Sequence, residues 1–259
     1  MATSVSIIGT AVTGWRNGIA AISKMPRLMG VALALHVVIG VLSAPLMTIK
    51  RGAVSEIASH VLTLPIGIIA SFVLAPVAIA VHRYVLLGEI TPRWAVSLQD
   101  RRLIRFFLFT VVLDFLAAIP GSLLMLSGKS SFLNLAVEAM LFVGVVILAV
   151  GMVILFPAIA VDAPGADWRH ALRDSKGHFW LVILVTLAAI VPLLVGYVPI
   201  FWLLLWPSGS SVPGAIVMAV AQSAAALVAI AVLAAVASRL YLAFADELGR
   251  PPNLQPLPA

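Results

Sequence analysis

Six long apolar stretches dominate this chain and decide what it can fold into. Each is about 20 residues or longer, which at about 1.5 Å per helical residue is enough to cross a hydrocarbon core of about 30 Å. Lipid cannot bond to backbone N–H and C=O groups, so such stretches must form helices. We expect an all-α, polytopic membrane helix bundle with six transmembrane helices near 29–48, 58–84, 104–126, 132–161, 179–206 and 214–243.

The composition leaves little sequence for a soluble domain. Hydrophobic residues make up 63% of the chain and charged residues 10%, whereas about a quarter of the residues in soluble domains are charged. Residues 1–259 are therefore expected to form a single integral membrane domain. The absence of cysteine excludes disulfides, thiolate nucleophiles and zinc–thiolate sites.

The 16 Lys and Arg residues are unevenly distributed about the apolar stretches. Lys50, Arg51 and Lys129 lie in short loops on one side of the predicted membrane, and the other 13 lie on the opposite side. By the positive-inside rule the richer side is cytoplasmic, which places both termini, including the 244–259 tail, in the cytoplasm. The chain is thus predicted to be a multi-pass protein of the bacterial inner membrane. Anionic phospholipid headgroups account for these cations, so no nucleic-acid partner is expected.

Residues 1–28 precede the first apolar stretch and carry a weak amphipathic pattern. Apolar residues recur there at three- and four-residue spacing, with Arg16, Asn17 and Lys24 between them. This spacing is typical of a helix that lies in the membrane interface on the cytoplasmic side. The apolar stripe consists of Ile7, Ile8, Ala11, Val12, Trp15, Ile19 and Ile22.

The chain shows signs of an internal repeat. Trp15, Trp94 and Trp168 each open a polar–apolar segment that leads into an outgoing and a returning span, and the stretch 74–82 parallels 155–162. One hypothesis is three tandem units, each an interfacial helix followed by a helical hairpin. The alternative is that low-complexity apolar sequence aligns easily with itself.

Several short motifs resemble those of a known family. They are Phe156-Pro157, the run 171–175, the run 178–180 that enters the fifth span, and the run 238–241 that ends the sixth, together with the N-terminal amphipathic helix. The chain resembles a broad bacterial family of six-helix inner-membrane proteins that includes the membrane domain fused to some glycerophosphodiester phosphodiesterases. The resemblance implies a membrane scaffold. The catalytic phosphodiesterase domain and its metal-binding acidic residues have no counterpart in this sequence.

Ionisable residues inside a membrane span are costly and are candidates for function, and we single out three of them. They are His36, Asp114 and Glu138. His36 and Asp114 enter from the same side to similar depth, so they are candidates for a pair. Such a pair would act either as a proton or cation relay, or as a polar clamp between helices worth roughly 1 kcal/mol. Glu138 lies near the outer end of its span, within reach of water or Lys129.

Proline and small residues mark the last two spans. Pro192, Gly196 and Pro199 interrupt the fifth span, which indicates either a broken helix at a transport site or, as we favour, a kink whose carbonyls bond to neighbouring helices. Two rows of small residues in the sixth span permit close helix approach. The rows are Ala215, Ala219 and Ser223, and Ala221, Ala225 and Ala229.

Two polar clusters lie outside the spans. Arg93, Arg101, Arg102 and Arg105 are candidates for contact with a lipid phosphate or an acidic partner, or they simply orient the protein. A second cluster has four-residue spacing on a predicted helix and consists of His170, Asp174 and His178. We interpret it as an ion-paired interfacial helix rather than a metal site. No metal or cofactor is expected.

The sequence contains no catalytic signature, so we expect a protein that is not an enzyme. The expected role is a scaffold or accessory subunit that binds lipid or a membrane-protein partner in the phospholipid bilayer, alone or as a homo-oligomer. The alternative is a small secondary transporter or permease that uses an intramembrane His36–Asp114 relay.

Overall fold

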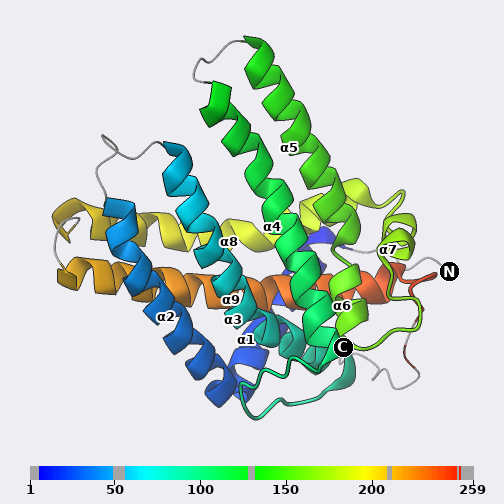
Figure 1. Cartoon of the computed structure of the whole chain (residues 1–259). Helices are drawn as coiled ribbons and strands as arrows, with labels where there is room; N and C mark the ends of the chain where they lie inside the picture. Colours follow the sequence, from blue (N-terminus) through cyan, green and yellow to red (C-terminus); the bar gives the residue numbers. More distant parts are fainter. Residues whose placement is uncertain (1–5, 49–55, 128–131, 209–211, 250, 252–259) are drawn as a thin grey trace.

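A computed structural model of the chain describes residues 6–48, 56–127, 132–208, 212–249 and 251. These residues form nine α-helices, which confirms the predicted all-α fold class (Figure 1). Six of the helices are long and apolar enough to cross a membrane, so the chain is a multi-pass membrane protein. In chain order the helices are α1 (Ile7–Lys24), α2 (Pro26–Thr48), α3 (Glu56–Leu87), α4 (Arg101–Ser127), α5 (Phe132–Met152), α6 (Leu155–Ala160), α7 (Trp168–Asp174), α8 (Phe179–Ser208) and α9 (Val212–Phe244).

The six long helices form three hairpins, α2/α3, α4/α5 and α8/α9. Figure 1 shows the hairpins diverging from a shared region that contains α1 and α6, with the α4/α5 hairpin directed away from the α8/α9 hairpin. α3 and α9 contact each other at the centre of this arrangement, and α2 and α4 flank α3. We call the shared region the base, and the parts of the hairpins nearer to 49–55, 128–131 and 209–211 the arms.

Two sequence expectations need correction. The fourth span, predicted near 132–161, ends at Met152, because a turn at 153–154 separates α5 from the short helix α6. Ser175 at the end of α7 donates a hydrogen bond of 2.9 Å to the carbonyl of Gly151, close to where α5 ends.

The second correction concerns the hypothesis of three repeats, in which an interfacial helix precedes each hairpin. A helix precedes the first and third hairpins, but residues 88–100 before the second form turns and irregular chain.

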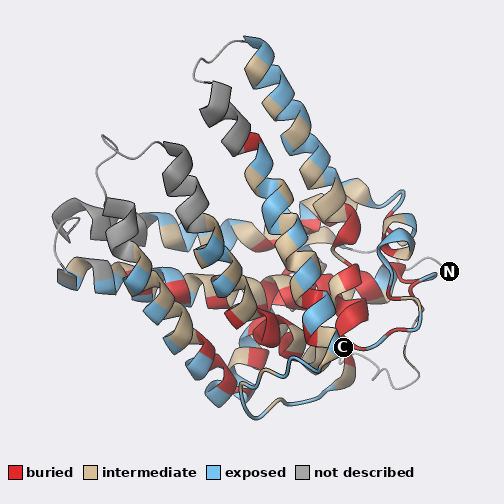
Figure 2. Cartoon of the chain, in the orientation of Figure 1, coloured by how far each residue is buried: buried red, intermediate tan, exposed pale blue. Residues whose placement is uncertain are grey.

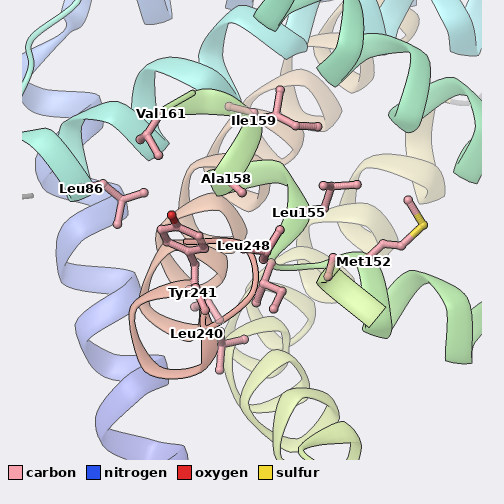
Figure 3. Packing of buried hydrophobic residues seen from close by; sticks show 14 of the residues in the cluster. Leu86, Met152, Leu155, Ala158, Ile159, Val161, Leu240, Tyr241 and Leu248 are labelled. Carbon is pink, nitrogen blue, oxygen red and sulfur yellow. The ribbon is translucent and has the colours of Figure 1, made fainter. Parts of the chain in front are cut away.

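Buried residues concentrate in the base (Figure 2). One hydrophobic cluster joins α6 to the second half of α9 and to the ends of α3 and α5, and an adjoining cluster joins α9 to the beginning of α2 and the end of α3. Figure 3 shows Tyr241 and Leu248 facing α6, both fully buried. The base is the tightly packed part of the molecule.

The N-terminal helix α1 enters the base through its small residues rather than its large ones. Gly14 and Gly18 contact Val236 and Val232 of α9, and a Cβ at Gly18 would lie only 2.9 Å from the Cα of Val232. Such spacing of small residues lets two helix backbones approach closely. The predicted stripe is correspondingly divided: Ala11 is buried, whereas Ile8, Val12 and Ile19 are exposed.

Two tryptophan side chains in the base bond to carbonyls that precede helix prolines. Trp15 Nε1 donates to the carbonyl of Ala189 at 2.9 Å, and Trp94 Nε1 donates to that of Val73 at 3.2 Å. Each acceptor lies three residues before a proline, Pro192 in α8 and Pro76 in α3, where the helix hydrogen-bond ladder is disturbed. α8 is continuous through Pro192, so the helix is not broken there, and the predicted kink stays a prediction. Trp168 differs, since its exposed ring stacks under the Arg169 guanidinium.

The chain after α9 is held against α7 by one carboxylate. The side chain of Asp174 accepts hydrogen bonds of 3.0 Å from the backbone N–H groups of Asp246, Glu247 and Leu248. Gly165 donates back to the carbonyl of Leu248 at 3.0 Å. These bonds fix the turn that follows the last span onto the segment that precedes the fifth.

Candidate functional site

Small residues on one face of α3 leave space beside the helix. Gly67, Ser71, Ala75 and Ala78 recur at three- and four-residue spacing and therefore share a face. Two cavities lie along this face, and both are lined by Ser71 and by Leu74. We call them the polar cavity, toward the arms, and the apolar cavity, toward the base.

The polar cavity lies between α2, α3 and α4 and has a volume of about 480 Å³. His36 and Asp114 both line it, so the structure brings together the two residues that the sequence predicted to be near each other. The described contacts do not include a direct bond between them. His36 Nδ1 lies 2.9 Å from the hydroxyl of Ser223 on α9, and Ser71 on α3 donates a hydrogen bond of 2.7 Å to the Asp114 carboxylate.

The apolar cavity lies between α3, α4, α6 and α9 and has a volume of about 440 Å³. Ala229 of α9 belongs to its lining, although the sequence pattern indicated that it serves close helix approach. The other predicted row of α9 does pack closely, because a Cβ at Gly40 of α2 would lie 3.2 Å from the Cβ of Ala219. Small residues thus bring helices together at one row and leave a cavity at the other.

His82 lines the apolar cavity and was missed by the sequence interpretation. It lies on α3, is 2% exposed, and its Nδ1 is 2.8 Å from the hydroxyl of Ser238 on α9. The span predicted near 58–84 already included it. The rule that selected His36, an ionisable side chain inside a span, would therefore have selected His82 as well.

Glu138 lies six residues after the start of α5 and is half-buried. It lines neither of the two cavities. The neighbouring residues 128–131, including Lys129, lie outside the described residues, so the proposed contact between Glu138 and Lys129 stays a prediction.

The four arginines of the predicted basic cluster have different surroundings. Arg102 pairs with Asp100 at 3.5 Å and with Asp162 at 3.2 Å, and Arg105 donates a hydrogen bond to the carbonyl of Ala166. These two side chains hold the loop after α6 to α4. Arg93, Arg101 and Arg105 are exposed, and the contact of this cluster with a lipid phosphate stays a prediction.

The helix predicted to carry His170, Asp174 and His178 ends at Asp174, so His178 lies beyond α7, but all three residues contact the base. Asp174 accepts the three backbone bonds described above, His170 Nδ1 donates to the carbonyl of Gly165 at 3.0 Å, and His178 stacks on Phe244 with ring centroids 4.2 Å apart. Among the described residues, no group of three or more His, Asp or Glu side chains is arranged to hold a metal ion.

The two cavities together could hold an amphipathic molecule alongside α3, and the polar cavity alone could hold a small solute or a proton path.

Comparison with protein-family models, with curated proteins and with solved structures finds no match to this chain. The resemblance to the membrane domain of glycerophosphodiester phosphodiesterases therefore stays a prediction.

Proposed function

We propose that this chain is a non-enzymatic scaffold or accessory subunit of the bacterial inner membrane that binds a lipid-like molecule. The observation that carries the proposal is the apolar cavity of about 440 Å³ between α3, α4, α6 and α9. Its volume falls within the range of about 300–1,000 Å³ that is typical of sites for small molecules. Its lining consists mainly of apolar side chains, among them Phe106, Phe156 and Leu233.

The charge distribution supports an orientation for this scaffold. The described basic residues that flank the spans lie in the base, whereas Lys50, Arg51 and Lys129 belong in sequence to the segments that join the two helices of a hairpin and lie outside the described residues. By the positive-inside rule the base faces the cytoplasm, and both termini lie there. Arg93 and Arg101 would then contact phospholipid phosphates, with each cation contributing on the order of 1 kcal/mol.

Filling the apolar cavity tests the proposal. Ala78→Leu and Ala229→Leu add side-chain volume inside the cavity, and Ala136→Leu on the exposed face of α5 is the matched control. Each protein is extracted directly from membranes into lipid nanodiscs, and the bound lipids are identified by mass spectrometry. The proposal predicts that a lipid enriched on wild type and on Ala136→Leu is lost from the two cavity variants. Identical lipid profiles in all four proteins would contradict it.

A secondary transporter is the second candidate, favoured by one observation. His36 and Asp114 line the same cavity although they lie on different helices. Proton uptake into proteoliposomes, driven by a potassium diffusion potential and followed with a pH-sensitive dye, distinguishes the two functions. A transporter would show uptake that Asp114→Asn abolishes, whereas the scaffold proposal expects no uptake above that of protein-free liposomes.

A further inference from the structure

The apolar cavity offers hydrogen-bond acceptors to a ligand and has its own donors already engaged. Three polar side chains line it: Ser71, Thr110 and His82. The hydroxyl of Ser71 donates to Asp114 at 2.7 Å, and that of Thr110 donates to the carbonyl of Phe106 at 3.0 Å. Each hydroxyl has a single proton to donate. Ser71 and Thr110 can therefore only accept a further hydrogen bond.

The protonation of His82 follows from its neighbour. Ser238 donates its hydroxyl proton to the carbonyl of Ala234 at 2.9 Å, so its oxygen must accept the bond of 2.8 Å that it shares with His82 Nδ1. The proton of His82 is thus on Nδ1. A neutral imidazole protonated at Nδ1 has a free lone pair on Nε2, which makes Nε2 an acceptor.

His82 is neutral because burial strongly disfavours a charge, and among the described residues only the backbone carbonyl of Ala234 would stabilise one. The side chain is 2% exposed, its ring packs against Phe106, and no carboxylate of the described residues bonds to it. An unpaired charge in such a setting would be strongly unfavourable. Protonation of both ring nitrogens is therefore excluded for the unliganded cavity.

The acceptor nitrogen reaches the cavity surface. His82 Nε2 has no hydrogen-bond partner among the described residues. No fully enclosed side-chain nitrogen or oxygen of those residues lacks a partner, so Nε2 cannot be fully enclosed. Because His82 lines the apolar cavity, the lone pair of Nε2 is available to a molecule inside it.

We propose that the apolar cavity binds an apolar molecule with a hydroxyl group, such as a long-chain or isoprenoid alcohol or a phenol, and that this hydroxyl donates a hydrogen bond to Nε2 of His82. The assignment rests on the proposed lipid-binding function and narrows its ligand class. A phosphate head would find neither Lys nor Arg in the cavity lining, and a ligand carbonyl would meet acceptors only.

Binding of 1-dodecanol and of its methyl ether to the protein in phosphatidylcholine nanodiscs tests the assignment. The two probes share an alkyl chain, but only the alcohol can donate a hydrogen bond. Affinity is measured by titration, and the Nε2 resonance of His82 is followed by ¹⁵N NMR of histidine-labelled protein. We expect the alcohol to bind about tenfold more tightly than the ether, because only the alcohol donates a hydrogen bond to the buried acceptor. Binding of the alcohol should also shift the His82 Nε2 resonance. His82→Phe should equalise the two probes, and His178→Phe, outside the cavity, should leave the difference intact.

The outcomes separate this inference from the function on which it rests. Equal affinities together with an unmoved His82 resonance in wild type would overturn the hydroxyl assignment while leaving the cavity a lipid site. Failure of both probes to bind would overturn the assignment too, and lipid profiles unchanged by Ala78→Leu would then overturn lipid binding itself. The NMR shift is measured on wild type, so the test does not depend on the folding of His82→Phe.

Discussion

The base and the arms of this molecule are built on opposite principles. In α3, which runs through the base, 39% of the residues in the membrane-spanning window are buried within the protein, whereas in α5 the share is 11% (Figure 2). Both windows are equally able to enter a membrane, with mean hydropathies of 2.4 and 2.5. Apolar character therefore does not determine which helix packs against protein.

The difference follows from what drives association in lipid. Lipid tails are as apolar as leucine, so helices gain little by leaving lipid for each other, and close packing and hydrogen bonds must hold them together. The base has such features: two glycines of α1 against α9, indoles bonded to helix carbonyls, and the carboxylate of Asp174. The described part of the arms has fewer such features, among them Gly40 against Ala219 and the bond from Ser71 to Asp114, and the polar cavity lies toward the arms. The base thus holds the helices together, while the apolar cavity in it and the polar cavity toward the arms leave room for ligands.

Replacing a glycine at the α1–α9 contact should have the largest effect. In Gly18→Leu the new Cβ would lie 2.9 Å from the backbone of Val232, so α1 must move away from α9. Overpacking usually costs about 1–3 kcal/mol, and we expect about 3 kcal/mol here because backbone rather than a flexible side chain is in the way. Unfolding in lipid nanodiscs measures the loss.

Gly144→Leu is the matched control for this substitution, because a Cβ at Gly144 of α5 has no neighbour within 4 Å. Leucine also has a better helix propensity than glycine, so this variant should be neutral or slightly stabilised. If both variants lost the same stability, the contrast between base and arms would be wrong.

Removing the Asp174 carboxylate should have the next largest effect. Asp174→Ala leaves three backbone N–H groups without their acceptor, and we expect a loss of about 2 kcal/mol given that the site is partly exposed to water. Amide hydrogen exchange at Asp246, Glu247 and Leu248 should accelerate markedly. Asp162→Asn, which removes one exposed ion pair with Arg102, should cost less than about 1 kcal/mol. Unchanged exchange in Asp174→Ala would show that other contacts hold the turn.

The sequence predicted the arms better than the base. Five of the six spans follow from apolar length, whereas the fourth ends earlier than predicted, and the similar depth of His36 and Asp114 indicated that the two could lie near each other. The contacts of the base depend on pairs far apart in the chain, such as Gly18 with Val232 or Asp174 with Leu248, and no local pattern specifies such partners. Spacing also could not tell that Ala219 packs against α2 while Ala229 borders a cavity, because small residues permit both.

Loss of an indole hydrogen bond should have a smaller effect than loss of the Asp174 carboxylate. Trp15→Phe keeps an aromatic ring but no longer donates to the carbonyl of Ala189, so we expect a loss of about 1 kcal/mol, the usual net value of one hydrogen bond. Trp168→Phe is the control, because the Trp168 ring is exposed and stacks with Arg169, and it should change stability by less than about 0.5 kcal/mol. The comparison is made by thermal unfolding in one lipid. Equal losses of stability in the two variants would mean that the indole hydrogen bond to the Ala189 carbonyl, three residues before Pro192, adds nothing to stability.

The smallest effect on stability is expected at the polar cavity. Asp114→Asn keeps an oxygen that can accept the hydrogen bond from Ser71, and residue 114 is not packed among other protein side chains. We therefore expect the free energy of unfolding to change by less than about 0.5 kcal/mol. A polar clamp between helices predicts instead a loss of roughly 1 kcal/mol. The double variant Ser71→Ala with Asp114→Asn separates these cases, since in a clamp its two losses would not add. A measured loss in Asp114→Asn as large as that in Trp15→Phe would place Asp114 among the contacts that hold the molecule together. An unchanged midpoint would leave the carboxylate available to a ligand or a proton, as the open arms suggest.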